Sequence, residues 1–271
     1  MITIENFGTR HGRLGNQMFQ VAVLMAIEDL RGHRLHLPRG DEALWECFEL
    51  EVPGEGPPGL HRFRETTGSC NFDPAVFEQP DGTEFHGYFQ SYRYLEGIDQ
   101  RLRRAFRFRE RHRAYSQAAL LALRRRHGRP LVAVHVRRGD YANPGFEDQW
   151  GDLARDGYYQ RAVATIGDDA LYLVFSDDVD WCRTSLDLGA SCIEYVAADS
   201  FSSLCMMTGC DVNVVANSSF SWWGAYLNPA AEVYAPTRWF GPAMPPPNDR
   251  QDDIVPPHWR TVPAFTDVMT P

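Results

Sequence analysis

Two arginines and an aspartate follow a short apolar segment near the middle of this 271-residue chain. Arg137 and Arg138 come directly after residues 131–136, and Asp140 stands three residues beyond Arg137. A guanidinium group is always charged in proteins, and its planar fork binds oxyanions in pairs, so arginine suits a phosphate. A carboxylate beside that phosphate could take a proton. The spacing predicts a site in which an arginine holds a leaving phosphate and Asp140 accepts a proton, and the alternative is a surface ion pair.

The segment 131–136 is the element that must position these side chains. Its sequence is Leu-Val-Ala-Val-His-Val, and it stands between Pro130 and the charged turn. A short apolar run between such breakers is typical of a strand buried on both faces. Ligands of open α/β sheets bind at the carboxyl edge of the strands, where the two arginines would lie. The Arg-Gly-Asp tripeptide 138–140 could instead be an adhesion signal, but nothing else in the chain indicates an extracellular loop.

The chain beyond this strand alternates between short apolar segments and helical patterns. We predict strands over 171–175, 192–196, 212–216 and 232–235, helices over 157–166 and 200–208 with Ser200 as the cap, and a helix that opens near Asn217. Strands that alternate with helices favour a mostly parallel sheet, whose carboxyl ends lie on one side. Polar side chains from three strand ends should therefore gather: Arg137, Arg138 and Asp140; Ser176, Asp177 and Asp178; Asn217, Ser218, Ser219 and Ser221.

The gathered side chains have the chemistry of a nucleotide pocket. Arginines would bind phosphates, and a carboxylate would bind ribose hydroxyls or a base N–H. Serine hydroxyls and a helix N-terminus would bind the remaining phosphate oxygens. Phe220 could stack on a base or belong to the core. The aspartate pairs 177–178 and 252–253 lack the Asp-X-Asp spacing of a metal site that holds a diphosphate, so we expect no metal.

The first half of the chain opens with the pattern strand, glycine loop, helix. We predict a strand over 2–7, a loop over 8–15, a helix over 16–31 ending at Gly32, and a strand over 35–37. In this order, backbone N–H groups at the start of the helix can bind an anion. The alternative is a tight turn that binds no ligand. Arg13, Asn16 and Gln17 make the loop more polar than a plain turn requires.

Eleven arginines lie between residues 101 and 129. Residues 114–126 have a helical pattern, with arginines in the last turn where they oppose the negative end of the helix dipole. These arginines form either a solvated helix face or an electrostatic patch for an anionic membrane surface or a phospholipid-linked acceptor. A new strand begins after Pro130, so we expect domains over 1–130 and 131–271.

Composition narrows the class of protein. The formal net charge of −9 argues against a nucleic-acid partner, and no apolar stretch is long enough to span a bilayer. The N-terminal residues lack the basic start and apolar core of a signal peptide. The six cysteines show no CxxC pair and no zinc spacing, so we expect free thiols in a reducing cytosol.

Four segments in order resemble the bacterial α-1,2-fucosyltransferases. They are Gly12-Arg-Leu-Gly-Asn-Gln17, His135-Val-Arg-Arg-Gly-Asp-Tyr141, Phe175-Ser-Asp-Asp178 and Asn217-Ser-Ser-Phe-Ser-Trp-Trp-Gly-Ala-Tyr-Leu227. The resemblance covers residues 2–240 and is weakest over 40–130, where acceptor choice would lie. It implies a GT-B arrangement of two Rossmann-like domains facing across a cleft, 1–130 on the acceptor side and 131–271 binding the donor. It also implies GDP-β-L-fucose as donor, a galactoside hydroxyl as acceptor, inversion, and no required metal or cofactor.

The resemblance also implies roles for individual residues. Arg137 would bind the β-phosphate and help the GDP leave, supported by His135 and Arg138. Asp177 or Asp178 would contact the guanosine. The phosphates would be bound by Ser218, Ser219 and Ser221. The first domain would contact the donor through Arg13, Gly15, Asn16 and Gln17. Asp140 is the expected base, with Glu147 and Asp148 as reserves, and GDP itself could take the proton instead. The alternatives are a same-fold transferase with another nucleotide sugar and a non-catalytic nucleotide- or glycan-binding module.

Overall fold

In the described part of the chain, the strands form two sheets, and every strand pair within them is parallel. The computed structural model describes residues 1–271 except 6, 9–11, 39–42, 144 and 266–271. The chain divides into two units. The first unit comprises residues 1–109 and 246–256, and the second comprises residues 110–245 and 257–271.

This division differs in two places from the predicted domains 1–130 and 131–271. The helix α4 (Glu110–His127) belongs to the second unit, because Leu120 packs against the core residues Met206 and Met207. Residues 246–256 return to the first unit, where the Asp253 carboxylate accepts a hydrogen bond from the Phe72 N–H at 2.8 Å. Pattern alone did not reveal either connection, since each depends on contacts between segments far apart in the sequence.

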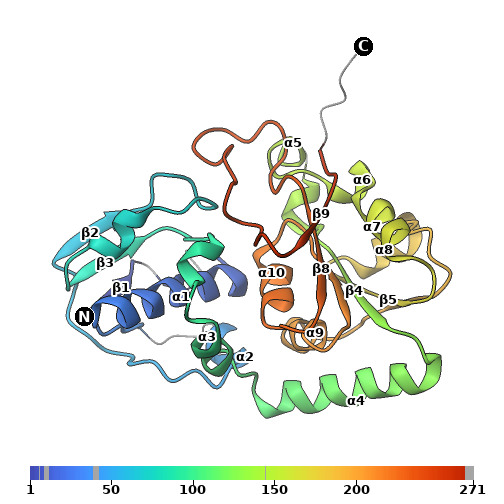
Figure 1. Cartoon of the computed structure of the whole chain (residues 1–271), viewed down its shortest axis with the longest axis horizontal. Helices are drawn as coiled ribbons and strands as arrows, with labels where there is room; N and C mark the ends of the chain where they lie inside the picture. The colour runs from blue at the N-terminus through green and yellow to red at the C-terminus, as the bar shows by residue number, and fades with distance from the viewer. Residues whose placement is uncertain (6, 9–11, 39–42, 144, 266–271) are drawn as a thin grey trace. The chain divides into compact units, whose positions relative to one another are not determined.

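The first unit is built on a small sheet with the strand order β1-β3-β2. Its elements are β1 (Thr3–Ile4), α1 (Leu14–Arg31), α2 (Ala43–Cys47), β2 (His61–Arg64), η2 (Pro74–Glu78), β3 (Thr83–His86), η3 (Tyr92–Leu95) and α3 (Asp99–Ala105). The helix α1 is buried along nearly all of its first fourteen residues, which makes it the core of this unit (Figure 1). It ends as predicted at Gly32, whose φ of 71° is left-handed. The predicted strand over 35–37 is reduced to a bridge between Ile2 and Leu35.

The second unit is built on a sheet with the strand order β6-β5-β4-β7-β8-β9. Its elements after α4 are β4 (Leu131–Val136), η4 (Gly139–Ala142), α5 (Glu147–Trp150), α6 (Leu153–Asp156), α7 (Tyr158–Ile166), β5 (Leu171–Ser176), α8 (Val179–Ser185), β6 (Ile193–Tyr195), α9 (Ser200–Met207), β7 (Val212–Val214), α10 (Ser219–Tyr226), β8 (Glu232–Pro236) and β9 (Arg260–Val262). The chain starts in the middle of the sheet, runs to one edge, returns to the middle and runs to the other edge. This is the doubly wound order of Rossmann folds.

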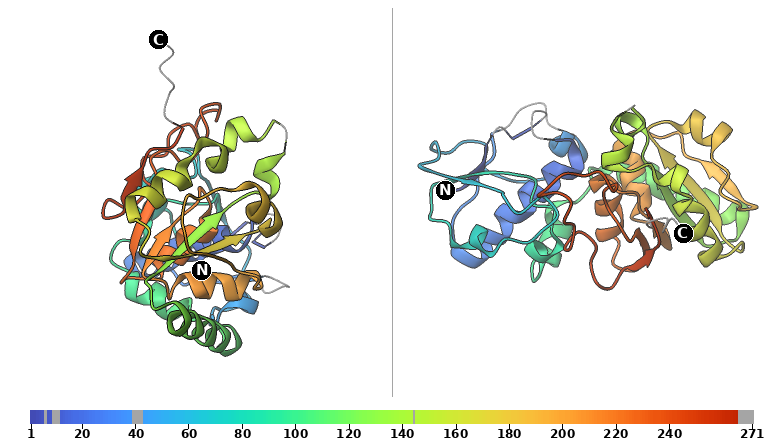
Figure 2. Two further views of the ribbon diagram at one scale, coloured as in Figure 1. Left: turned by 90° about the vertical axis from the view of Figure 1, so that its right-hand side faces the viewer. Right: turned by 90° about the horizontal axis from the view of Figure 1, so that it is seen from above.

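Helices cover both faces of this sheet (Figure 1 and Figure 2). Along β4, Val132, Val134 and Val136 face a core that contains Tyr159 of α7 and Cys182 of α8. The alternate residues Leu131 and Ala133 face the core formed with α4 and α9. Each buried valine or leucine contributes about 1.5–3 kcal/mol of transfer free energy. This two-sided burial explains why β4 reads as an unbroken apolar segment.

The predicted strands and helices of this half are confirmed, with two corrections and one omission. The helix α9 is capped by Asp199 and not by Ser200, because the Asp199 carboxylate accepts hydrogen bonds from the N–H groups of Phe201 and Ser202 at 2.9 Å. Residues 147–156, for which no helix was predicted, contain the short helices α5 and α6. The strand β9 was not predicted. In the described residues, no helix combines the length and apolar character needed to cross a membrane.

Candidate functional site

The loops that follow β4 and β7 meet in the middle of the second sheet. The two strands are direct neighbours, with Val134 opposite Val214. The strand that follows β4 in sequence, β5, lies toward one edge of the sheet, and the strand that follows β7, β8, lies toward the other edge. Such a reversal point is where open α/β sheets bind ligands. Tyr141 Oη donates a hydrogen bond to the carbonyl oxygen of Asn217 at 3.2 Å, and the His135 ring lies 5.4 Å from the Phe220 ring. The structure thus brings the predicted arginine and serine segments together.

Arg137 lies between two carboxylates in this site. Its guanidinium forms ion pairs with Asp140 and with Asp177, and it is 13% exposed. It also lies 5.3 Å from the centre of the Tyr141 ring. Asp140 is 52% exposed, so a bound phosphate could replace it on the guanidinium without leaving a buried charge unpaired. The role of Asp140 as proton acceptor stays a prediction.

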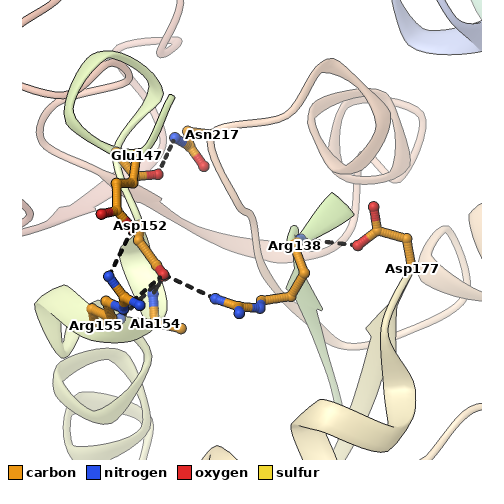
Figure 3. Close-up of polar contacts among 8 residues, drawn as sticks. Arg138, Glu147, Asp152, Ala154, Arg155, Asp177 and Asn217 are labelled. Atoms are coloured by element: carbon orange, nitrogen blue, oxygen red, sulfur yellow. Dashed lines mark hydrogen bonds and ion pairs between the residues drawn. The ribbon is translucent and has the colours of Figure 1, made fainter. Parts of the chain in front are cut away.

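Arg138 has a different environment, although it is adjacent in sequence (Figure 3). Its side chain is buried, where Nη1 donates to Asp152 Oδ2 at 2.9 Å and the guanidinium lies 3.7 Å from the centre of the Trp181 ring. Its backbone N–H donates to Asp177 Oδ1 at 2.9 Å. Arg138 therefore fixes the loop to α6 and α8, and ligand binding by Arg137 stays a prediction.

Asp177 links the two arginines, since its two oxygens accept hydrogen bonds from the Arg138 N–H and the Arg137 guanidinium. Gly139 allows this close approach: its φ is +28°, and a Cβ atom there would lie 2.5 Å from Asp177 Oδ2. Asp178 caps α8 by accepting a hydrogen bond from the Trp181 N–H at 3.2 Å. Contact of either aspartate with a guanosine stays a prediction.

His135 is uncharged at neutral pH. Burial is the main cause that lowers its pKa to about 4, and the nearby Arg137 lowers it further while Asp177 raises it. Its Nδ1 is buried without a hydrogen-bond partner among the described residues. A neutral imidazole beside Arg137 adds no charge to the site, and it can exchange a hydrogen bond with a ligand.

The serines after β7 fall into two groups. Ser218 is the N-cap of α10 without a side-chain capping bond, and Ser219 is the first residue of that helix, so both lie at its positive end. Ser221 is buried, and its hydroxyl accepts from the Ala216 N–H at 3.1 Å and donates to the Ser218 carbonyl at 3.4 Å. Asn217 donates to the Trp150 carbonyl at 2.6 Å, which fixes the loop. Ser218 and Ser219 are therefore better placed than Ser221 to bind a phosphate.

In the first unit, the predicted polar residues gather at the start of α1. Arg13 is its N-cap, and Gly15 and Gln17 are buried in its first turn. Asn16 Oδ1 accepts a hydrogen bond from Gln90 Nε2 at 2.7 Å. Residues 9–11 of the predicted loop lie outside the described residues. Contact of Arg13, Gly15, Asn16 and Gln17 with a donor stays a prediction.

A carboxylate that the sequence did not reveal lies near these residues. Glu65 follows β2, and its two oxygens accept hydrogen bonds from the N–H groups of Tyr88 and Phe89 at 2.9 and 3.0 Å. Burial is the main cause that raises the pKa of Glu65 to about 7. The strand before it is mostly exposed and shows no apolar alternation, so its pattern gave no signal. The nearest signal in the sequence was the aromatic pair Tyr88 and Phe89, whose N–H groups donate to Glu65.

Most of the arginine-rich stretch over 101–129 is neutralised by acidic neighbours. Arg101 pairs with Glu28 and Asp29, and further pairs join Arg103 to Asp99, Arg107 to Glu49, Arg113 to Glu110, Arg124 to Asp211 and Arg126 to Glu194. This pairing favours the solvated helix face over an electrostatic patch, and membrane contact stays a prediction. The six cysteines are free thiols. Within the described ranges, no group of three His, Cys, Asp or Glu side chains is arranged to hold a metal ion.

Solved structures show the class of fold. Fucosyltransferase NodZ from Bradyrhizobium aligns with a TM-score of 0.56 at 14% identity, covering 84% of this chain and 93% of that one. The NodZ α-1,6-fucosyltransferase soaked with GDP-fucose gives a TM-score of 0.54 at 15% identity, covering 84% and 92%. At this identity the likeness concerns the fold, which is the predicted α/β fold of GT-B-like type.

The family is shown by sequence. The model of glycosyl transferase family 11 matches residues 80–259, and the chain belongs to that family. Galactoside alpha-(1,2)-fucosyltransferase 1 of Homo sapiens is 26% identical over 247 residues, and the match covers 83% of this chain and 66% of that protein. The Aotus nancymaae protein of the same name is 27% identical over 246 residues, and that match covers 82% of this chain and 65% of that protein. The O-antigen biosynthesis glycosyltransferase WbnK of Escherichia coli is 38% identical over 122 residues, covering 40% and 39%. The chain thus spans about two thirds or less of the length of these relatives.

The buried pair of Arg138 and Asp152 gives a prediction about stability. Asp152→Ala leaves the Arg138 guanidinium buried without its carboxylate, so the free energy of unfolding should fall by about 3–5 kcal/mol. Denaturant unfolding followed by circular dichroism measures this loss. Asp148→Ala, at an exposed position in the neighbouring α5, should change stability by less than about 0.5 kcal/mol. Equal effects of the two substitutions would contradict the anchoring role.

The raised pKa of Glu65 gives a prediction about pH. The folded protein keeps the proton of Glu65 up to about pH 7 while the unfolded chain loses it near pH 4.5, so the contribution of Glu65 to stability is greatest below pH 4.5 and is lost as the pH rises to 7. Glu65→Gln cannot lose that proton. From pH 5 to pH 8 the variant should therefore gain up to about 3 kcal/mol relative to the wild type. Unfolding curves at both pH values test this, and an unchanged difference would contradict it.

Proposed function

We propose that this protein is an inverting fucosyltransferase that moves L-fucose from GDP-β-L-fucose to the 2-hydroxyl of a galactoside. The observation that carries the proposal is the Arg137 guanidinium, held at the reversal point of the sheet beside the start of α10. An arginine and a helix N-terminus at one point form a site for a diphosphate. The named activities of the galactoside fucosyltransferases that the chain resembles support the choice of sugar and acceptor.

The reaction assigns a role to each group at the reversal point. The acceptor oxygen attacks the anomeric carbon of fucose, and the bond from that carbon to the β-phosphate oxygen breaks, which inverts the configuration. Arg137 neutralises the charge that develops on the departing GDP, together with Ser218, Ser219 and the N-terminus of α10. His135 and Phe220 lie beside this position, and Arg138 fixes the loop. The proposal includes donor contacts from Asp177, Asp178, Arg13, Gly15, Asn16 and Gln17.

Asp140 has a positioning role in this proposal. Its ion pair holds the Arg137 guanidinium in place before the donor binds, and its role as the proton acceptor stays a prediction. Glu147 is also engaged, since it pairs with Arg155 at 2.7 Å. Three further points remain predictions from the sequence. They are that catalysis needs no bound metal, that the acceptor is lipid-linked, and that the protein is cytoplasmic at the inner face of the membrane.

Donor identity can be tested by ligand-induced stabilisation. A ligand that binds the folded state stabilises it by RT ln(1 + [L]/Kd), so GDP and GDP-fucose should raise the Tm while UDP and UDP-galactose should not. Incubation of GDP-fucose with a panel of β-galactosides should then release GDP and form a fucosylated product. Stabilisation by UDP would indicate another nucleotide sugar. Stabilisation by GDP without transfer to any galactoside would indicate a binding module.

Replacement of Arg137 should separate its role from folding. Arg137→Ala should lower kcat by about 10²–10³-fold, because a positioned charge on the leaving group is lost. It should also abolish most of the Tm increase caused by GDP. Arg183→Ala is a matched control, since Arg183 is a half-exposed arginine of α8 whose ion-pair partner, Asp180, is 93% exposed. Transfer by Arg137→Ala at the wild-type rate would refute the proposed role.

A further inference from the structure

Tyr141 joins three segments of the second unit at the reversal point of the sheet. Its hydroxyl donates a hydrogen bond to the Asn217 carbonyl oxygen at 3.2 Å. Its ring is stacked on the Trp150 ring, with the ring centres 5.5 Å apart and an angle of 25° between the ring planes. The Asn217 side-chain amide in turn donates to the Trp150 carbonyl oxygen at 2.6 Å. Three contacts therefore link η4, α5 and the loop before α10 pairwise.

The segment that follows β8 supports these three contacts. The buried Phe240 ring meets the Trp150 ring edge-on, with the ring centres 5.4 Å apart. The Gly241 N–H donates to the Gln149 carbonyl oxygen at 2.8 Å. The helix α5 has four residues, and a helix that short is not stable by itself. Its position therefore depends on this packing, and so does the position of the Tyr141 ring that is stacked on it.

The Tyr141 ring lies beside the Arg137 guanidinium. The guanidinium carbon is 5.3 Å from the ring centre, which is within the distance at which an aromatic face attracts a cation. Asp140 and Asp177 also hold this guanidinium, but each carboxylate occupies N–H donors that a phosphate would need. The aromatic face attracts the cation without taking up an N–H donor. The contact with Tyr141 can therefore persist when a phosphate replaces a carboxylate on Arg137.

The same tyrosine contacts the segment that opens α10. Asn217, whose carbonyl oxygen accepts the Tyr141 hydroxyl, directly precedes the N-cap residue Ser218. Arg137 and the N-terminus of α10 lie on different loops, so their separation depends on the contacts that join those loops. A diphosphate has a fixed length, and it can meet both groups only if that separation is kept. Tyr141 contacts Arg137 with its ring and the α10 loop with its hydroxyl, so it can keep that separation.

We propose that Tyr141 is a positioning residue, which holds the Arg137 guanidinium at the N-terminus of α10 so that both contact one diphosphate. This inference rests on the proposed function, because phosphate binding by Arg137 is part of that proposal. Tyr141 acts through Arg137 and touches no reacting atom. The β-phosphate carries more negative charge on the departing GDP than on GDP-fucose, because it keeps the electron pair of the broken bond. A misplaced Arg137 should therefore affect kcat and GDP affinity more than the KM for GDP-fucose.

Two substitutions of Tyr141 test the assignment. Tyr141→Leu removes the ring and the hydroxyl, and it should lower kcat and the affinity for GDP by about tenfold each, with the KM for GDP-fucose changed by less than about threefold. Tyr141→Phe keeps the ring, so its kcat should recover to within about threefold of the wild type. Phe146→Leu is the control from the same loop, since Phe146 is 49% exposed, and its kcat should stay within about twofold. The Tm of each variant without ligand reports folding.

A double-mutant cycle distinguishes positioning of Arg137 from general support of the loop. In the Arg137→Ala background, Tyr141→Leu should change kcat by less than about twofold, because the guanidinium through which the ring acts is already absent. A full tenfold loss in that background would overturn the proposal. So would a folded Tyr141→Leu with the wild-type kcat and GDP affinity, or a Tyr141→Phe as impaired as Tyr141→Leu. If the wild type transfers no fucose, the proposed function fails, and the same cycle measured as the GDP-induced rise in Tm still tests Tyr141.

Discussion

The ion pairs that hold Arg137 between Asp140 and Asp177 are the interaction on which the site of the second unit depends. A free guanidinium on a loop would lose the entropy of several rotatable bonds when it bound a phosphate. Here that ordering is already achieved in the folded protein. Asp140 is half exposed, so a phosphate that replaced it on the guanidinium would leave it in contact with water. Asp177 cannot leave as easily, since its other oxygen accepts the Arg138 N–H and so fixes the loop.

Two adjacent arginines therefore perform opposite tasks. Arg138 turns inward to Asp152 and Trp181, while Arg137 remains at the carboxyl edge of β4 (Figure 3). The pair therefore separates into Arg138, which anchors the loop, and Arg137, which stays between Asp140 and Asp177. The spacing alone could not show which was which, whereas the family resemblance had already assigned the phosphate to Arg137. That choice depends on Asp152, fourteen residues further on, in a segment whose short helices have no recognisable period.

The strand β4 and the end of α1 were predictable from local pattern, whereas the exposed strand β2 and the contacts between distant segments were not. The bounds of β4 were correct because six residues buried on both faces leave a continuous apolar signature after Pro130. The end of α1 was correct because Gly32 adopts the left-handed conformation that closes a helix. The strand β2 has mostly exposed side chains and gave no pattern, so Glu65 behind it was missed. The return of residues 246–256 to the first unit depends on hydrogen bonds such as that from Phe72 to Asp253, which no local pattern encodes.

The proposed transfer sets an electrostatic requirement for the site of the second unit. A departing diphosphate needs fixed positive charge, and the second unit supplies a guanidinium and a helix N-terminus at the end of its central strands. These groups lie at the reversal point of one sheet, where Asp140 and Asp177 already hold the Arg137 guanidinium in place. A diphosphate that bound there would therefore meet a positive charge that is fixed before it arrives.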